Sequence, residues 1–215
     1  MIFSIPLTPK APISHLAARA VTCIRGDRTL FSNLSFEVFG GQCLHIRGQN
    51  GVGKTSLLRL LTGLSSQEAG EILWNGQDIK SHSEQYHRQL LFAGHRDALK
   101  EDLTALENIQ MYAAIDGIDL SAADCLTTLW RFGLRGREDL PVSCLSAGQK
   151  KRVLMARMIS RQAQLWILDE PFNALDTHAV AELQDVIQEH LNNQGLVIMT
   201  SHQALSMSHV KVLDL

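Results

Sequence analysis

Eight consecutive residues, GQNGVGKT, follow the pattern G-x-x-x-x-G-K-[ST] that holds the phosphates of a nucleotide. The context is the one this pattern requires, because the apolar run Cys43 to Ile46 precedes it and the helix-like segment SLLRLLTGL follows it. Glycines let consecutive backbone N–H groups point at a phosphate chain, and the positive end of the next helix adds to the attraction. Lys54 would then reach the β- and γ-phosphates, and Thr55 would bring its hydroxyl to Mg²⁺. The sequence therefore predicts a nucleoside triphosphate site formed by Gly48, Gln49, Asn50, Gly51, Val52, Gly53, Lys54, Thr55 and Ser56.

Two carboxylates, Asp169 and Glu170, end a second apolar segment, LWILDE. A buried strand that ends in this way is the usual partner of a phosphate-binding loop. Asp169 would orient Mg²⁺ or its water ligands, and Glu170 could take a proton from an attacking water. Alone, such a pair is more often a helix cap or part of a solvated loop. The phosphate loop upstream favours a catalytic pair.

A third motif, LSAGQ at residues 145–149, leads into the amphipathic segment KKRVLMARMIS. The hydroxyl of Ser146 and the open backbone at Gly148, both at a helix N-terminus, would form an anion site, although such a pair alone is often only a cap. In this order, between the phosphate loop and the carboxylates, the pentapeptide resembles the signature motif of the ATP-binding cassette (ABC) ATPases, whose usual form is LSGGQ. The resemblance implies ATP and Mg²⁺ as cofactors. It also implies that Ser146, Gly148 and Gln149 close the nucleotide site of a second subunit.

Two further segments resemble functional loops of this family. NALD, ending at Asp176, resembles the loop that crosses the dimer interface, and TSH, ending at His202, resembles the switch that contacts the γ-phosphate. The resemblance therefore implies a catalytic set of Lys54, Glu170 and His202. A lone histidine is more often structural, and the remaining histidines are interpreted in that way.

Two positions depart from the family pattern. Arg25 stands where many members have an aromatic residue that stacks on adenine. A guanidinium can also stack on a base, so Arg25 remains a candidate base-binding residue. His95 stands where the family has a glutamine that senses Mg²⁺ and the membrane partner. It could take a similar polar role near the metal, or it could only pack the hinge, and both interpretations stay open.

Composition sets wider limits. With 215 residues, 45% of them hydrophobic, the chain can form one large domain, and a net charge of −2 gives no electrostatic reason to expect nucleic acid as a partner. Its four cysteines form no C-x-x-C pair, which is typical of reduced thiols in a cytosolic protein. No stretch approaches the roughly 20 apolar residues of a membrane-spanning helix. Residues 1–15, interrupted by prolines, are predicted to be a disordered leader or an over-extended start, and residues 16–215 a single ABC ATP-binding domain.

Strand-like and helix-like segments alternate along the chain. Thr104 and Glu107 form a capping box at the start of a stretch that is almost all helix-like to about Ser160, and Asn75-Gly76 is a turn signal. The pattern predicts an α/β fold: a P-loop NTPase core with a helical signature subdomain at about residues 95–160 and an N-terminal antiparallel β region. The predicted strands are Ala17 to Ile24, Leu34 to Phe39, Glu71 to Trp74, Leu90 to Ala93, Leu165 to Leu168 and Leu196 to Thr200, with a helix from about Thr177 to Asn193.

From about Ala17 to Leu215 the chain also resembles the ATP-binding subunits of bacterial cytochrome c maturation exporters, in stretches such as RGDRTLF, AGEILWNG and AGHRDALKEDLTALENI. This resemblance implies a homodimer docked on a membrane-embedded permease at the cytoplasmic face of the bacterial inner membrane. It also implies a role in haem export or haem handling during c-type cytochrome biogenesis. No C-x-x-C-H motif suggests that the chain itself binds haem.

Three alternatives remain at this stage. The first is the ATPase subunit of another ABC exporter. The second is a soluble ABC ATPase that acts on DNA or ribosomes, which is disfavoured because no long coiled coil separates Lys54 from Asp169. The third is a nonenzymatic nucleotide sensor, which could dispense with the carboxylate of Glu170.

Overall fold

The fold is built on a parallel sheet. The computed structural model describes residues 14–94, 98–173, 175–203, 205 and 207–215. Five strands form the central sheet in the order β6-β7-β8-β3-β9, and every neighbouring pair is parallel. Because parallel strands end at the same edge of a sheet, the loops after these strands gather on one side. The strands are β3 (Cys43–Arg47), β6 (Leu90–Ala93), β7 (Leu165–Leu168), β8 (Leu196–Thr200) and β9 (Val210–Asp214).

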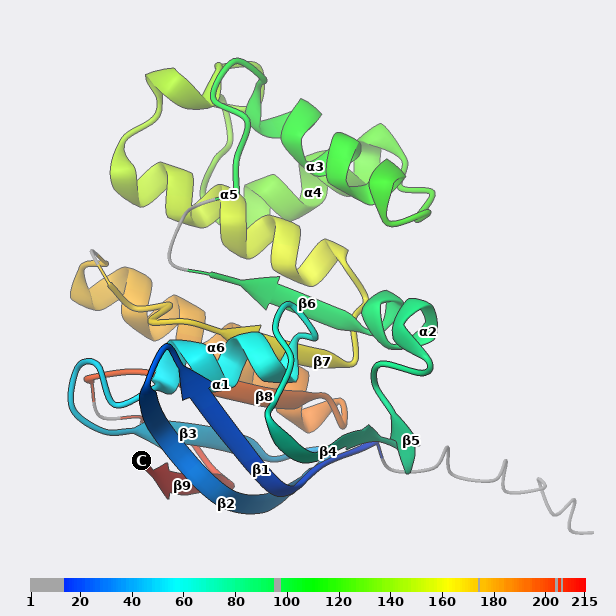
Figure 1. The fold of residues 1–215 in the computed structure, drawn as a ribbon. Coiled ribbons are helices and arrows are strands. Elements are labelled where there is room, and N and C mark those ends of the chain that lie inside the picture. Colours follow the sequence, from blue (N-terminus) through cyan, green and yellow to red (C-terminus); the bar gives the residue numbers. More distant parts are fainter. Residues whose placement is uncertain (1–13, 95–97, 174, 204, 206) are drawn as a thin grey trace, which may run out of the picture.

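A second, antiparallel sheet has the strand order β2-β1-β4-β5. Asn75 and Gly76 connect β4 to β5 with φ angles of 51° and 82°, so the turn predicted there is confirmed. The predicted N-terminal antiparallel β region is confirmed, and the core sheet of the predicted α/β fold is parallel (Figure 1). The strands are β1 (His15–Arg25), β2 (Arg28–Phe39), β4 (Ala69–Trp74) and β5 (Gln77–Asp78).

Helix α1 (Lys54–Leu61) lies between the two sheets (Figure 1). Its leucines are fully or almost fully buried in one cluster, which includes side chains of β1 and β4 on one side and of β3, β7 and β8 on the other. Burying four leucines contributes on the order of 6–12 kcal/mol in transfer free energy. This packing fixes the N-terminus of α1, and with it the phosphate loop, against both sheets.

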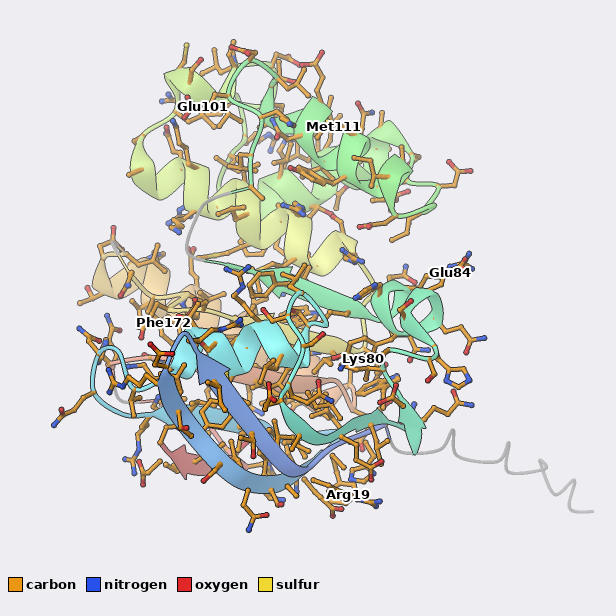
Figure 2. The ribbon with its side chains drawn as sticks, in the orientation of Figure 1. Arg19, Lys80, Glu84, Glu101, Met111 and Phe172 are labelled. Carbon is orange, nitrogen blue, oxygen red and sulfur yellow. The ribbon has the colours of Figure 1, made fainter. Side chains whose placement is uncertain are left out.

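Three helices form a layer at one end of the molecule, away from β1 and β2 (Figure 1). They are α3 (Ala105–Ile115), α4 (Ala122–Arg131) and α5 (Ala147–Ser160), with a short 3₁₀ turn at Val142–Cys144. The predicted capping box is confirmed, because the Thr104 hydroxyl accepts from the Glu107 amide at 3.1 Å and the Glu107 carboxylate accepts from the Thr104 amide at 2.8 Å. Glu101, labelled in Figure 2, lies at the same end and accepts a hydrogen bond from Lys150 of α5 at 2.9 Å.

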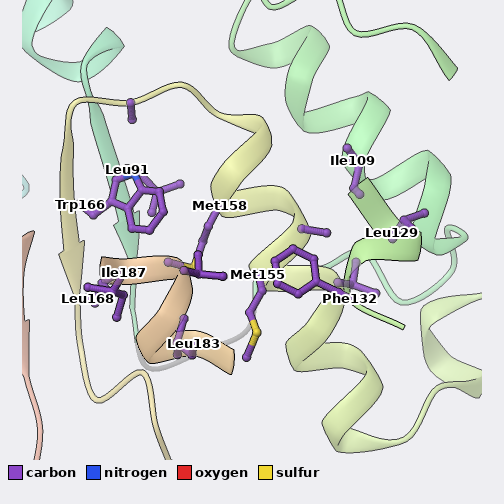
Figure 3. Close-up of a cluster of buried hydrophobic side chains, with 14 of the residues drawn as sticks. Leu91, Ile109, Leu129, Phe132, Met155, Met158, Trp166, Leu168, Leu183 and Ile187 are labelled. Carbon is purple, nitrogen blue, oxygen red and sulfur yellow. The ribbon is translucent and has the colours of Figure 1, made fainter. Parts of the chain in front are cut away.

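A continuous apolar cluster joins this helical layer to the central sheet (Figure 3). Met155 and Met158 of α5 pack with Trp166 and Leu168 of β7 and with side chains of α6 (Thr177–Asn192). Phe132 extends the same cluster towards α3 and α4. The helical layer is therefore attached to the core by apolar packing as well as by the chain connections. The remaining helix, α2 (Ser83–Arg88), precedes β6.

Several predicted boundaries differ from the observed ones. The leader was predicted to end at residue 15. In the structure, the Ser14 carbonyl accepts a hydrogen bond from the Gly40 amide at 2.8 Å and β1 begins at His15, so these two residues belong to the folded part. Residues 1–13 lie outside the described part. Strand β2 begins at Arg28 rather than Leu34, and β9 was not predicted. Most of residues 132–146 are not helical, because a loop and a 3₁₀ turn connect α4 to α5.

None of the helices in the described part of the chain has the length and the apolar character needed to cross a membrane.

Candidate functional site

The phosphate loop connects β3 to α1, as the sequence predicted. Two of its glycines are required by close contacts at positive φ. A Cβ on Gly48 would come within 2.8 Å of Val52 Cγ1 and 2.9 Å of the Leu215 carbonyl, and a Cβ on Gly53 within 3.2 Å of Leu30 Cβ. With φ angles of 147° and 122°, these two positions also exclude side chains for backbone reasons. Both positions therefore require glycine, because a side chain would clash with the neighbouring residues and strain the backbone.

Lys54 begins α1 and folds back over the loop. Its Nζ donates to the Gly48 carbonyl at 2.7 Å and lies 3.4 Å from the Gln49 carbonyl. These contacts hold the ammonium group over the concave side of the loop, where a phosphate chain would replace the carbonyl oxygens as its partner. The charge of Lys54 is thus directed towards the predicted nucleotide position.

Asp169 joins three segments that are far apart in the sequence. One carboxylate oxygen accepts from the Thr55 hydroxyl at 3.1 Å, and the other accepts from the Thr200 hydroxyl at 2.8 Å. Thr55 is on α1, Asp169 follows β7, and Thr200 ends β8. Asp169 is buried, with 6% of its surface exposed, and its hydrogen bond to the buried Thr200 is shielded from water, whereas the bond to Thr55 lies at the edge of the open cavity. The two segments predicted to surround a metal ion therefore meet through Asp169.

Glu170 and His202 face each other beside this contact. His202 Nε2 lies 3.4 Å from Glu170 Oε1, which is within ion-pair range when the imidazole is protonated but lacks hydrogen-bond geometry. The Glu170 amide donates to the Thr200 hydroxyl at 2.9 Å, and its backbone has a φ of 51°. A left-handed backbone at a non-glycine residue costs on the order of 1 kcal/mol, and such strain is concentrated at functional sites. Phe172, labelled in Figure 2, is buried just after this turn.

These residues line one open cavity of about 620 Å³. It brings together most of the residues predicted from the phosphate loop, the carboxylate pair and the TSH segment. Two further residues, Leu30 of β2 and Asn173, were not among the predicted site residues. Leu30 carries no chemical signal in the sequence, and only the packing of β2 against the loop reveals it. The lining residues are Leu30, Asn50, Gly51, Gly53, Lys54, Thr55, Ser56, Asp169, Glu170, Asn173 and His202.

The signature residues do not line this cavity. Ser146 is the N-cap of α5, where its hydroxyl accepts from the Gln149 amide at 3.3 Å and its amide donates to the Gln149 side chain at 3.0 Å. Gly148 has open space within 4 Å of the position of a Cβ. The amides of Ser146 and Gln149 are therefore satisfied within the cap, while the backbone at Gly148 is uncovered on its Cβ side.

The other predicted residues are placed as follows. Asp176 is the N-cap of α6, and its side chain accepts from the Ala179 amide at 2.8 Å. Arg25 is exposed at the end of β1, on the hairpin that carries Leu30, and is not among the described residues that line the cavity. His95 lies outside the described residues, so both interpretations of it remain predictions.

The chemistry of the cavity fits Mg²⁺. The Thr55 hydroxyl and the Asp169 carboxylate provide hard oxygen donors 3.1 Å apart, and Glu170 Oε1 is buried without a hydrogen-bond partner among the described residues. Thr55 and Asp169 would hold the ion, directly or through water. When bound, Mg²⁺ supplies positive charge next to the phosphates.

Comparison with known proteins agrees with this geometry. Residues 31–173, about two thirds of the chain, match the family described as ABC transporter. The matched region begins in β2 and includes the phosphate loop, the LSAGQ segment and the two carboxylates. The chain therefore belongs to the ABC transporter family.

Within that family the chain is similar to a more narrowly described group. It is 46% identical over 205 residues to the "Cytochrome c biogenesis ATP-binding export protein CcmA" of Nitrosomonas europaea, which covers 95% of this chain and 96% of that protein. It is 48% identical over 197 residues to the protein of the same name from Escherichia coli strain K12, with 92% and 93% covered.

Solved structures share the fold. A putative ABC transporter ATP-binding protein from Pyrococcus furiosus has a TM-score of 0.82 over 94% of this chain and 97% of its own, at 22% identity. An ATP-binding subunit of an ABC transporter has a TM-score of 0.79 over 92% of this chain and 85% of its own, at 26% identity. The predicted α/β fold with an ABC ATPase core is thus confirmed.

Proposed function

We propose that this protein is the ATP-hydrolysing subunit of an ABC transporter that acts in c-type cytochrome biogenesis, in haem export or a haem-handling step. Family membership supports the ATPase, and the names of the relatives support the biological role. Two copies dock on a membrane-embedded permease at the cytoplasmic face of the bacterial inner membrane. Closing and opening of the dimer drive the permease.

The observation that carries the ATPase proposal is the pair of hydrogen bonds to Asp169. The Thr55 hydroxyl donates to one carboxylate oxygen at 3.1 Å, and the hydroxyl of Thr200, at the end of β8, donates to the other at 2.8 Å. Glu170, the next residue, has a buried carboxylate oxygen that accepts no hydrogen bond among the described residues and lies 3.4 Å from His202 Nε2, so its lone pairs remain for a proton taken from water. A nucleotide sensor would not need such a base.

Each residue then has a defined task in hydrolysis. Lys54 and the loop amides stabilise negative charge on the γ-phosphate as it develops. Glu170 orients and polarises the attacking water, and His202, 3.4 Å from it, faces the same phosphate. Ser146 and Gly148 of the second copy complete the donor set. This last assignment is supported by the cavity lining, because Ser146 and Gly148 are not among the described residues that line the cavity of their own chain.

Glu170→Gln tests the catalytic assignment in the purified transporter complex. The amide keeps the size of the side chain but is no longer basic, so ATP binding should persist while steady-state hydrolysis falls by about 100-fold or more. The variant should accumulate as an ATP-bound closed dimer, measurable by gel filtration. Near-normal turnover would show that Glu170 is not the base.

Lys54→Ala is the matched comparison. It removes a phosphate contact rather than a base, so the affinity for ATP should fall, and Glu170→Gln should leave it nearly unchanged. Retained ATP binding in both variants would contradict the assignment of Lys54. Co-purification of the chain with a polytopic membrane protein separates the transporter role from a free ATPase.

A further inference from the structure

One buried polar residue outside the cavity is hydrogen-bonded to the residue just before His202, which lines the cavity. His45 is in the middle of β3, where its neighbours Leu44 and Ile46 are also buried, and it is only 7% exposed. The described residues show one hydrogen bond of its ring, from Nε2 to the carbonyl of Ser201 at 2.9 Å. An apolar side chain would fill this core position without the cost of burying an imidazole.

The direction of this hydrogen bond follows from its chemistry. A carbonyl oxygen can only accept, so the hydrogen must be on Nε2 of His45. The registered pairs between β3 and β8 end at Ile46 and Thr200, and the Ser201 carbonyl lies one residue beyond them. The side chain of His45 therefore provides a partner where the strand ladder no longer does.

Ser201 is the residue immediately before His202. Its hydroxyl accepts from the Gln203 amide at 2.9 Å, and Thr200 on its other side is held by Asp169 and the Glu170 amide. His202 thus lies in a short turn that is anchored on both sides. Its side chain is 57% exposed, so the position of the backbone has a large influence on where the imidazole lies relative to Glu170.

We propose that His45 is a positioning residue for His202. By donating to the Ser201 carbonyl, His45 holds the 200–203 turn so that the imidazole of His202 faces Glu170 and the γ-phosphate position. This inference rests on the proposed ATPase function, because it assigns His45 to the same reaction. It also goes beyond that function, because His45 is not among the described residues that line the cavity. Its hydrogen bond goes to Ser201, which is not part of the phosphate loop motif.

His45→Leu and His45→Gln test this proposal in the intact complex. Leucine fills the core position but cannot donate, whereas the glutamine amide can reach the same carbonyl. We expect His45→Leu to lower kcat by about five- to tenfold, the effect of one neutral hydrogen bond, with the KM for ATP unchanged within about twofold. His45→Gln should restore most of the loss. A role in packing alone would predict the opposite order, with leucine better than glutamine.

A double-mutant cycle separates positioning from a general effect. In a His202→Ala background, His45→Leu should cause no further loss of kcat, because the side chain that it positions is absent. The same fold-loss in both backgrounds would overturn the proposal.

Hydrogen–deuterium exchange of the 199–203 segment gives a second readout that needs no ATP hydrolysis. His45→Leu should increase exchange there, and His45→Gln should not. Unchanged exchange in His45→Leu would overturn the proposal even if activity falls. If the wild-type complex fails to hydrolyse ATP, the proposed function is wrong, and the exchange result still decides whether His45 holds the turn.

Discussion

The Thr200 hydroxyl donates to Asp169 Oδ1 at 2.8 Å and accepts from the Glu170 amide at 2.9 Å. Thr200 is fully buried at the end of β8, and the two acidic residues follow the neighbouring strand β7. One hydroxyl therefore holds both the carboxylate of Asp169, the proposed metal ligand, and the backbone of Glu170, the proposed base. Neither function of Thr200 requires contact with a nucleotide.

Thr200→Val should separate this hydroxyl from the shape of its side chain. Valine occupies nearly the same volume but leaves the Glu170 amide and one Asp169 oxygen unsatisfied in a buried place. We expect a loss of about 1–3 kcal/mol in the free energy of unfolding, together with lower ATPase activity. Urea denaturation and steady-state kinetics measure the two effects. Thr200→Ser keeps the hydroxyl and should remain much closer to wild type; equal losses in both variants would assign the effect to packing.

If two subunits share each nucleotide site, as we propose, ATPase activity should depend on dimer formation. Ser146 lines no part of the cavity of its own chain, so a monomer should bind ATP but hydrolyse it poorly. The ATPase rate of the purified chain should therefore rise more steeply than linearly with protein concentration. Mixing Lys54→Ala with Ser146→Arg should restore activity, because heterodimers contain one site without either defect. Full activity in a verified monomer at high dilution would contradict the shared site.

Arg25 is predicted to contribute to base binding from the β1–β2 hairpin. Stacking of its guanidinium on adenine is worth on the order of 0.5–2 kcal/mol, so Arg25→Ala should weaken ATP binding by about two- to thirtyfold. Arg25→Tyr should bind ATP at least as well as wild type and discriminate better against GTP. Titration calorimetry with both nucleotides measures these affinities. Because Arg25 is not among the described lining residues, unchanged ATP affinity in Arg25→Ala would leave Leu30 as the hairpin residue next to the nucleotide.

Because its imidazole is buried, His190 should make the folded protein less stable in mild acid. Its ring stacks on Trp166 with centroids 3.9 Å apart, and burial lowers its pKa from 6.5 to about 4, although nearby backbone hydrogen bonds at Gln164 and Leu196 act in the opposite direction. Between these two pH values the unfolded chain binds a proton that the folded chain does not, so stability should fall as the pH drops from about 6.5 towards 4. Over this pH range His190 should lower the free energy of unfolding by about 3 kcal/mol in total.

Chemical denaturation at several pH values checks this dependence. His190→Phe keeps a ring against Trp166 and removes the titrating group, so this part of the pH dependence should disappear. An unchanged pH profile in His190→Phe would assign the acid sensitivity to other groups.

The local parts of the site could be predicted from the sequence. The phosphate loop, the acidic pair and the capping box at Thr104 depend on residue types at fixed short spacing. The backbone geometry of a turn or a helix end is decided within a few residues, so such patterns identify it directly. The Asn75-Gly76 turn is predictable for the same reason.

The long-range contacts were decided by the tertiary structure alone. Leu30 reaches the cavity because β2 packs on the phosphate loop, and His45 reaches Ser201 because β3 lies beside β8 in the sheet. The alternation of side chains along a strand predicts which face a residue occupies, but it carries no information about which strand lies next to it. That order is set by the burial of whole sheet faces against α1 and the helical layer. The sequence therefore determined which groups could bind and hydrolyse a nucleotide, and the packing of the sheets determined which residues hold those groups in place.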